Sequence, residues 1–305
     1  MLPLDDETRQ IAMAMLLWGV LPALAAASVV MAALEWLGGA KQAPAAATLA
    51  LISGAVLGLW LVAAAPLYKM DDPAPLLSTL GVALKLDDAE STWNRLPWAV
   101  LAALCVERLA RILDMQTQDG WLLRGAAAVG IAWWLIPEPT RATFVWLAPG
   151  FAGVVFLEWE LLQRLAAEPP GGGVLLCLAL ALVVAGIVLL FAGLGRGMEI
   201  AVISASALAG IGLVAWWRRA DASGAVPAGA VILPSLLLMA HQGTSVETIP
   251  WTAFATAALA PLMLAGTWPV RHWPAIGRLF AGLFLILIPL LAAVLLAQQG
   301  ATEGE

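Results

Sequence analysis

The sequence predicts an all-α integral membrane protein: a polytopic helical bundle with about ten transmembrane helices (eight to ten fit the pattern) and short loops. Three observations support this class. The 305 residues are 62% hydrophobic and only 12% charged, with a mean hydropathy of +0.91. Apolar segments of span length follow one another, and tryptophan gathers near their ends. Since a soluble domain needs about 25% charged residues to cover its surface, most of this surface is expected to face the lipid bilayer.

A transmembrane helix needs about 20 mostly apolar residues, because the hydrocarbon core is ~30 Å thick and a helix rises ~1.5 Å per residue. Six segments with long apolar cores meet this requirement: 11–37, 45–68, 172–194, 198–217, 250–268 and 274–298. Four further segments have shorter apolar cores or charges near one end: 96–113, 121–136, 144–165 and 226–241. The polar connection 69–95 contains an apolar stretch too short to cross. It fits an interfacial or re-entrant helix, or a surface helix packed over the bundle.

Tryptophan marks the ends of these segments. Eleven of the fifteen lie near a predicted span end, namely Trp36, Trp98, Trp121, Trp133, Trp134, Trp159, Trp216, Trp217, Trp251, Trp268 and Trp273. Indole rings prefer the headgroup level, where the ring is half buried and its N–H reaches water. An aromatic belt explains the spacing without an aromatic cofactor site.

The chain is expected to form a single membrane domain over residues 1–305. The run Glu-Pro-Pro-Gly-Gly-Gly at 168–173 separates five predicted spans in 1–167 from five in 174–305. An odd number of spans in each half is what an inverted repeat requires, although the halves share no convincing residue-level repeat.

With ten helices, both termini lie on one side of the membrane. That side holds six of the fifteen lysines and arginines, namely Arg9, Lys69, Lys85, Arg95, Arg141 and Arg196. The other nine, among them Arg218, Arg219, Arg271 and Arg278, fall opposite. The positive-inside rule then places both termini outside the cytoplasm. The expected location is a bacterial cytoplasmic membrane.

Composition also argues against several function classes. A net charge of −6 leaves no basic surface for nucleic acid. Cys105 and Cys177 lie in apolar runs without CxxC spacing, so each is predicted to be a small core residue rather than a metal ligand or half of a disulfide. His241 and His272 fall at opposite ends of the predicted spans. No cofactor, metal site, catalytic residue or catalytic motif is therefore expected, and the chain is not predicted to be an enzyme.

Ionisable residues within apolar segments are the candidate functional residues, because a charge in lipid costs several kcal/mol. Glu107 and Arg111 are four residues apart and share one helix face. They fit either a gate inside the bundle or a helix end whose side chains reach out to the interface, which is the commoner case. In 156–164, Glu160 and Arg164 form a second pair at the same spacing, and Glu158 precedes them.

This second group partly resembles the Glu-Glu-x-x-x-Arg motif of the CAAX-type intramembrane glutamic proteases. Only Glu160 and Arg164 match, because Trp159 occupies the place of the first glutamate. The histidine contexts of that family are also missing around His241 and His272. The chain is therefore not assigned to the family.

Helix breakers and small residues also occur inside the predicted spans. The in-span prolines are Pro22, Pro149, Pro234, Pro261 and Pro289. Ala-Pro-Gly at 148–150 is the best candidate for a broken helix, which would place Pro149 and Gly150 at a binding or gating site; a simple kink is the commoner outcome. Small residues four apart permit close helix packing: Gly54 and Gly58, Gly193 and Gly197, Ser206 and Gly210.

Two functions fit this sequence. The first is a permease-like transporter of a lipophilic or weakly polar solute, with Glu107, Arg111, Glu158 and Glu160 as coupling or gating residues. The second is a non-catalytic membrane subunit or scaffold that packs against membrane protein partners; an intramembrane enzyme is a distant third. A polar cavity lined by Glu107 or Glu158 would favour transport, and a solid bundle with an apolar outer groove would favour a subunit.

Overall fold

The computed structural model describes residues 13–39, 42–63, 95–115, 117–136, 142–168, 170–243 and 249–303. These residues form ten α-helices and three further helical segments, and they contain no strand. The α-helices are α2 (Leu21–Gly38), α3 (Ala43–Ala63), α5 (Leu96–Ile112), α6 (Thr117–Leu135), α7 (Ala142–Ala167), α8 (Gly172–Phe191), α9 (Gly195–Arg218), α10 (Val226–Gly243), α11 (Trp251–Leu259) and α12 (Ala275–Glu303). The others are the π-helical η1 (Met15–Val20) and the 3-10 helices η4 (Ser223–Ala225) and η5 (Ala260–Val270).

Seven helical segments are long and apolar enough to cross a membrane. They are Met15–Gly38, Ala43–Val62, Gly172–Phe191, Gly195–Arg218, Ser223–Gln242, Trp251–Val270 and Ala275–Thr302. The all-helical, multi-pass class is thus supported, whereas the predicted count of about ten spans is not, because α5, α6 and α7 are not among the seven. The predicted interfacial segment 69–95 lies outside the described residues except for Arg95.

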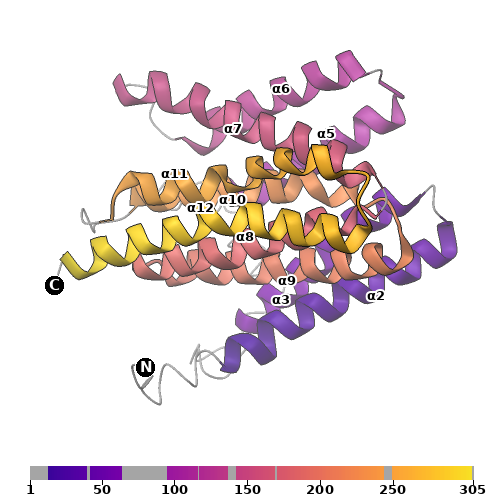
Figure 1. The fold of residues 1–305 in the computed structure, drawn as a ribbon, viewed down its shortest axis with the longest axis horizontal. Helices are drawn as coiled ribbons and strands as arrows, with labels where there is room; N and C mark the ends of the chain where they lie inside the picture. The colour runs from indigo at the N-terminus through magenta and orange to yellow at the C-terminus, as the bar shows by residue number, and fades with distance from the viewer. Residues whose placement is uncertain are drawn as a thin grey trace.

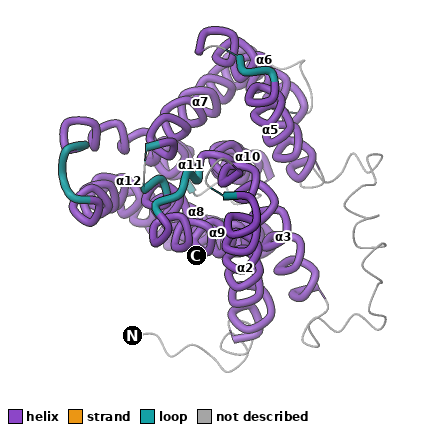
Figure 2. The backbone as a smooth tube through the Cα atoms, turned by 90° about the vertical axis from the view of Figure 1, so that its right-hand side faces the viewer, coloured by secondary structure: helices purple, strands orange, loops and turns teal. Residues whose placement is uncertain are grey.

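The helices pack on two sides of α10 (Figures 1 and 2). The antiparallel pair α8 and α9 packs on one side of α10, with α2 and α3 against α9 and with α11 and α12 against α8. Helices α5, α6 and α7 form a separate layer on the other side, at the top of both views. Helix α10 contacts α5, α7, α8, α9 and α11, and its whole apolar span is buried.

The connection between α9 and α10 defines one end of the bundle, which we call the Ser223 end. Gly172 at the start of α8 packs against Trp216 near the end of α9, and Pro44 at the start of α3 packs against Gly224. The start of α2 and the end of α12 both lie towards the opposite end (Figure 1). Helices that follow one another in the described chain therefore run in opposite directions between these two ends.

Helices α2, α3 and α9 approach closely where they carry glycine. A Cβ on Gly54 would lie 2.7 Å from the carbonyl oxygen of Ala23, and one on Gly210 would lie 2.6 Å from that of Leu24. The predicted packing role of these small residues is confirmed at both positions. Gly193 instead occupies a turn with φ of +73°, a conformation that suits glycine.

Two interpretations of individual residues need correction. Helix α7 continues through Pro149, so of the two interpretations of 148–150, a broken helix or a kink, the broken helix is wrong. A change of helix type occurs instead beside Pro261, where α11 gives way to η5. Cys177 is buried as predicted, but Cys105 is exposed.

Adding one methyl group at Gly210 is expected to destabilise the bundle. Gly210→Ala places a Cβ against a backbone oxygen that cannot move aside, and such overpacking costs about 1–3 kcal/mol. The matched control is Gly130→Ala on α6, since no atom lies within 4 Å of a Cβ there; it should be neutral or slightly stabilising. Thermal unfolding of both variants in detergent measures the difference, and equal midpoints would contradict the close-packing interpretation.

Candidate functional site

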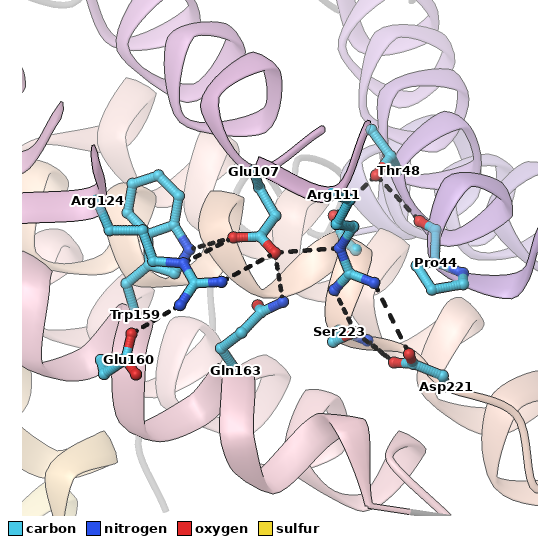
Figure 3. Close-up of polar contacts among 11 residues, drawn as sticks. Pro44, Thr48, Glu107, Arg111, Arg124, Trp159, Glu160, Gln163, Asp221 and Ser223 are labelled. Carbon is cyan, nitrogen blue, oxygen red and sulfur yellow. Dashed lines mark hydrogen bonds and ion pairs between the residues drawn. The ribbon is translucent and has the colours of Figure 1, made fainter. Parts of the chain in front are cut away.

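The most polar part of the described interior is a group of side chains around Glu107 on α5, at the Ser223 end (Figure 3). We call it the Glu107 cluster; it comprises Glu107, Arg111, Arg124, Trp159, Glu160, Gln163, Arg164, Asp221 and Ser223. Glu107 is only 3% exposed. Helical spacing explains the contribution of α7, since Trp159 and Gln163 are four apart and face α5 together.

The Glu107 carboxylate accepts hydrogen bonds from four side chains. The Arg111 Nε donates to Oε1 at 3.0 Å and the Arg124 Nε to Oε2 at 2.9 Å. Arg124 Nη2 also reaches Oε1, at 3.3 Å. From α7, the Gln163 Nε2 donates to Oε1 at 2.7 Å and the indole N–H of Trp159 to Oε2 at 3.2 Å. Both oxygens are thus fully hydrogen-bonded.

Arg124 on α6 connects this carboxylate to a second one. Its Nη1 donates to Oε2 of Glu160 at 2.7 Å. Glu160 in turn accepts from Nε and Nη2 of Arg164 at 2.9 and 2.8 Å. Arg164 is 59% exposed, so its pair with Glu160 contributes little to stability, whereas Arg124 is largely buried.

Arg111 extends the cluster towards the other helices. Its Nη2 donates to the Ser223 Oγ at 2.6 Å, and its Nη1 lies 3.8 Å from the Asp221 carboxylate. Asp221 accepts a hydrogen bond from the Ser223 backbone N–H at 2.8 Å, which fixes the turn that opens η4.

Helix α3 is joined to the same turn. The Thr48 Oγ1 donates to the Gly224 carbonyl at 2.8 Å. A Cβ on Gly224 would lie 1.8 Å from the Pro44 carbonyl oxygen, so only glycine fits there. Polar contacts therefore run continuously from α7, through α6 and α5, to α3.

Charge balance makes this buried cluster feasible. Three carboxylates (Glu107, Glu160 and Asp221) face three guanidinium groups (Arg111, Arg124 and Arg164). Isolated burial of any one charge would cost several kcal/mol, and only close pairing with further hydrogen bonds offsets that cost.

Both ion pairs inferred from four-residue spacing are confirmed. The interpretation of Glu107 as a side chain reaching out to the interface is wrong, because it is enclosed. Trp159 was expected near the interface but is fully buried. The sequence did not identify four other members of the cluster, namely Arg124, Gln163, Asp221 and Ser223. Arg124 carried a usable signal, since it is an arginine within a predicted span.

Glu158 lies on a different face of α7, because consecutive helical residues are about 100° apart. It is 0% exposed, and neither of its carboxylate oxygens makes a hydrogen bond within the described residues. Helix α10, which packs against α7, carries Ser235, whose hydroxyl is likewise buried without such a bond. Two buried polar groups thus occur on helices in contact.

Pro149 and Gly150 are not part of either group. Both are exposed on α7, and a Cβ on Gly150 would have no atom within 4 Å. Gly150 is eight residues from Glu158, about 12 Å along the helix. The structure thus places the predicted gating residues of α7 in three separate environments.

The two groups of polar side chains differ in how many hydrogen bonds they make. The Glu107 carboxylate is saturated with donors and serves as a structural tie. Within the described residues, no group of three or more His, Cys, Asp and Glu side chains is arranged to hold a metal ion. The Glu158 carboxyl, by contrast, has no hydrogen-bond partner within the described residues.

Comparison with known proteins finds no matching family model, no matching curated protein and no matching solved structure. Function is therefore inferred from the residues of this chain alone.

Neutralising Glu107 should destabilise the protein strongly. Glu107→Gln leaves two arginines facing the site without their carboxylate, and breaking a buried pair in this way costs about 3–5 kcal/mol. Arg164→Gln at the exposed edge of the same cluster should cost at most ~1 kcal/mol. Thermal unfolding in detergent compares the two, and a Glu107→Gln variant as stable as Arg164→Gln would refute the structural role.

Proposed function

We propose that this multi-pass membrane protein is a permease-like carrier of a lipophilic or weakly polar solute, and that Glu158 couples transport to a proton. The observation that carries the proposal is the Glu158 carboxyl, which is enclosed without a hydrogen bond in the described part of the chain. A buried, unpaired ionisable group is costly, and a bundle needs none for packing. Its presence is explained if it exchanges a proton or contacts a solute.

The contact between α7 and α10 offers further polar groups near this carboxyl. Val231 and Leu238 on α10 pack in one apolar cluster with Phe151 and Val155 on α7. Ser235 lies between the first two in sequence. Pro234 has no N–H, so it cannot supply the usual helical hydrogen bond to the carbonyl four residues earlier. Carriers use such interrupted helices to present polar backbone to a solute.

In this proposal the Glu107 cluster closes the Ser223 end. It joins the layer of α5, α6 and α7 to the α9–α10 connection through Arg111 and Ser223. Separation of that layer from the remaining helices would open the α7–α10 contact at this end. Because the ion pairs are charge-balanced, they can break and reform as a unit when water enters.

We further infer that α5, α6 and α7 also cross the membrane, giving ten spans. Each runs antiparallel to its neighbour in the chain, and the charges of the Glu107 cluster on these helices are paired. Arg218, Arg219, Arg271 and Arg278 gather at the Ser223 end, which favours that end as cytoplasmic and both termini as external. Exposed tryptophans near helix ends, such as Trp36 and Trp217, support an interfacial belt in a bacterial cytoplasmic membrane.

A non-catalytic membrane subunit remains the second candidate. The specific observation in its favour is the saturation of Glu107, which makes the α5–α7 layer a static unit rather than a moving one. Purification in mild detergent separates the two candidates. Defined partner chains that co-purify in fixed proportion would support the subunit, and a lone particle would support the carrier.

Replacing Glu158 with an apolar residue of similar size should stabilise the protein. Glu158→Met removes a buried carboxyl without a hydrogen bond in the described residues, and such a change is expected to raise the free energy of unfolding by about 1–3 kcal/mol. Thermal unfolding in detergent measures it. A loss of stability would mean that the carboxyl has a structural partner, and the coupling role would fall.

Proton movement tests the carrier directly. Proteoliposomes loaded with a pH-sensitive dye are challenged with a panel of weakly polar solutes. We expect at least one solute to drive proton entry with the wild-type chain and none to do so with Glu158→Gln. Glu168→Gln, at an exposed carboxylate, is the matched control and should behave as wild type. Equal proton entry with Glu158→Gln would exclude Glu158 as the coupling residue.

A further inference from the structure

A pocket of about 60 Å³ lies at the Ser223 end, apart from the Glu107 cluster and Glu158. Five helix ends meet around it: the C-terminal ends of α7, α9 and η5, and the N-terminal ends of α8 and α12. Helix α12 lines it from Ala275 to Gly282, seven residues or about 10 Å of helix length.

The pocket has a polar rim and an apolar floor. Arg271, Arg278 and Glu168 lie at the rim, with Trp216 and Trp268 beside them. The floor is formed by apolar side chains, among them Cys177, Leu264 and Leu279.

Glycine keeps the floor open. A Cβ on Gly282 would lie 3.2 Å from both the Cys177 Sγ and the Leu264 Cδ2. A larger side chain at position 282 would occupy the apolar part of the pocket. A side chain at this position would therefore crowd Cys177 and Leu264, which line the pocket.

Electrostatics at the rim favour an anion. The two arginines outnumber the single carboxylate of Glu168, which is exposed. The N-terminal ends of α8 and α12 add partial positive charge, because backbone N–H groups in the first turn lack helical acceptors. Neither helix has an acidic residue in its first turn to neutralise that charge.

We propose that this pocket binds an anionic phospholipid. The phosphate lies between Arg271 and Arg278, and the glycerol and the first part of an acyl chain enter the apolar floor over Gly282. The lipid-facing side of α12 continues the apolar surface, since Phe280 and Phe284 are 66% and 67% exposed. A free phosphate ion would satisfy the rim but leave the apolar floor unused, so a molecule with both parts fits better. Basic side chains near the membrane surface attract anionic lipids.

Native mass spectrometry of the purified full chain tests this proposal. The protein is titrated with phosphatidylglycerol and, separately, with phosphatidylcholine of the same acyl chains. We expect the wild type to prefer phosphatidylglycerol, and Arg271→Gln to weaken that binding about fivefold without changing phosphatidylcholine binding. Arg271 is exposed, so this variant should fold normally. Arg219→Gln, at an exposed arginine of the same end outside the pocket, is the control and should bind as wild type.

Two further measurements distinguish recognition of the whole lipid from recognition of its phosphate alone. Gly282→Leu fills the floor and should reduce phosphatidylglycerol binding while leaving the arginines in place. Inorganic phosphate at equal concentration should not displace the lipid. Equal phosphatidylglycerol binding by wild type and Arg271→Gln would overturn the proposal. Displacement by inorganic phosphate, together with unchanged binding in Gly282→Leu, would also overturn it, because the site would then recognise phosphate alone.

Discussion

The arrangement of α5, α6 and α7 depends on one requirement, that the buried Glu107 carboxylate be hydrogen-bonded. Its donors come from three helices: Arg111 on α5, Arg124 on α6, and Trp159 with Gln163 on α7. A rotation of any of these helices by one residue would remove a donor and leave a charge uncompensated. Such directional contacts favour one packing arrangement of the three helices, because only that arrangement satisfies the buried charge.

The rest of the bundle is held by a different kind of contact. Helices α2, α3 and α9 meet through backbone approach at Gly54 and Gly210, where dispersion forces over a close interface replace polar contacts. The two regions join at the α9–α10 connection, where Ser223 contacts Arg111 and Gly224 contacts Thr48 and Pro44. A short loop thus transmits any displacement of the charged layer to the closely packed helices.

The sequence was sufficient for the fold class and for contacts within one helix. Apolar length and tryptophan spacing predict the helices, and four-residue spacing predicts the Glu107–Arg111 and Glu160–Arg164 pairs, because helical periodicity alone sets those distances. Contacts between different helices could not be predicted from the sequence. Nothing local shows that Arg124 meets Glu107 seventeen residues away or that Trp159 turns inward to donate its N–H. The Pro149 break failed because a local signal competed with the strong preference of an apolar segment for continuous helix.

The position of α10 has a consequence for how the chain is made. This helix is fully enclosed, yet seven of the ten α-helices precede it in the sequence and leave the ribosome first. Four of those seven, α5, α7, α8 and α9, contact α10 and cannot reach their final packing until α10 lies between them. The Ser223 partner of Arg111 arrives with it, so the charged layer is also completed late in synthesis. Biogenesis therefore requires an open intermediate in which the α5–α7 layer stands away from α8 and α9.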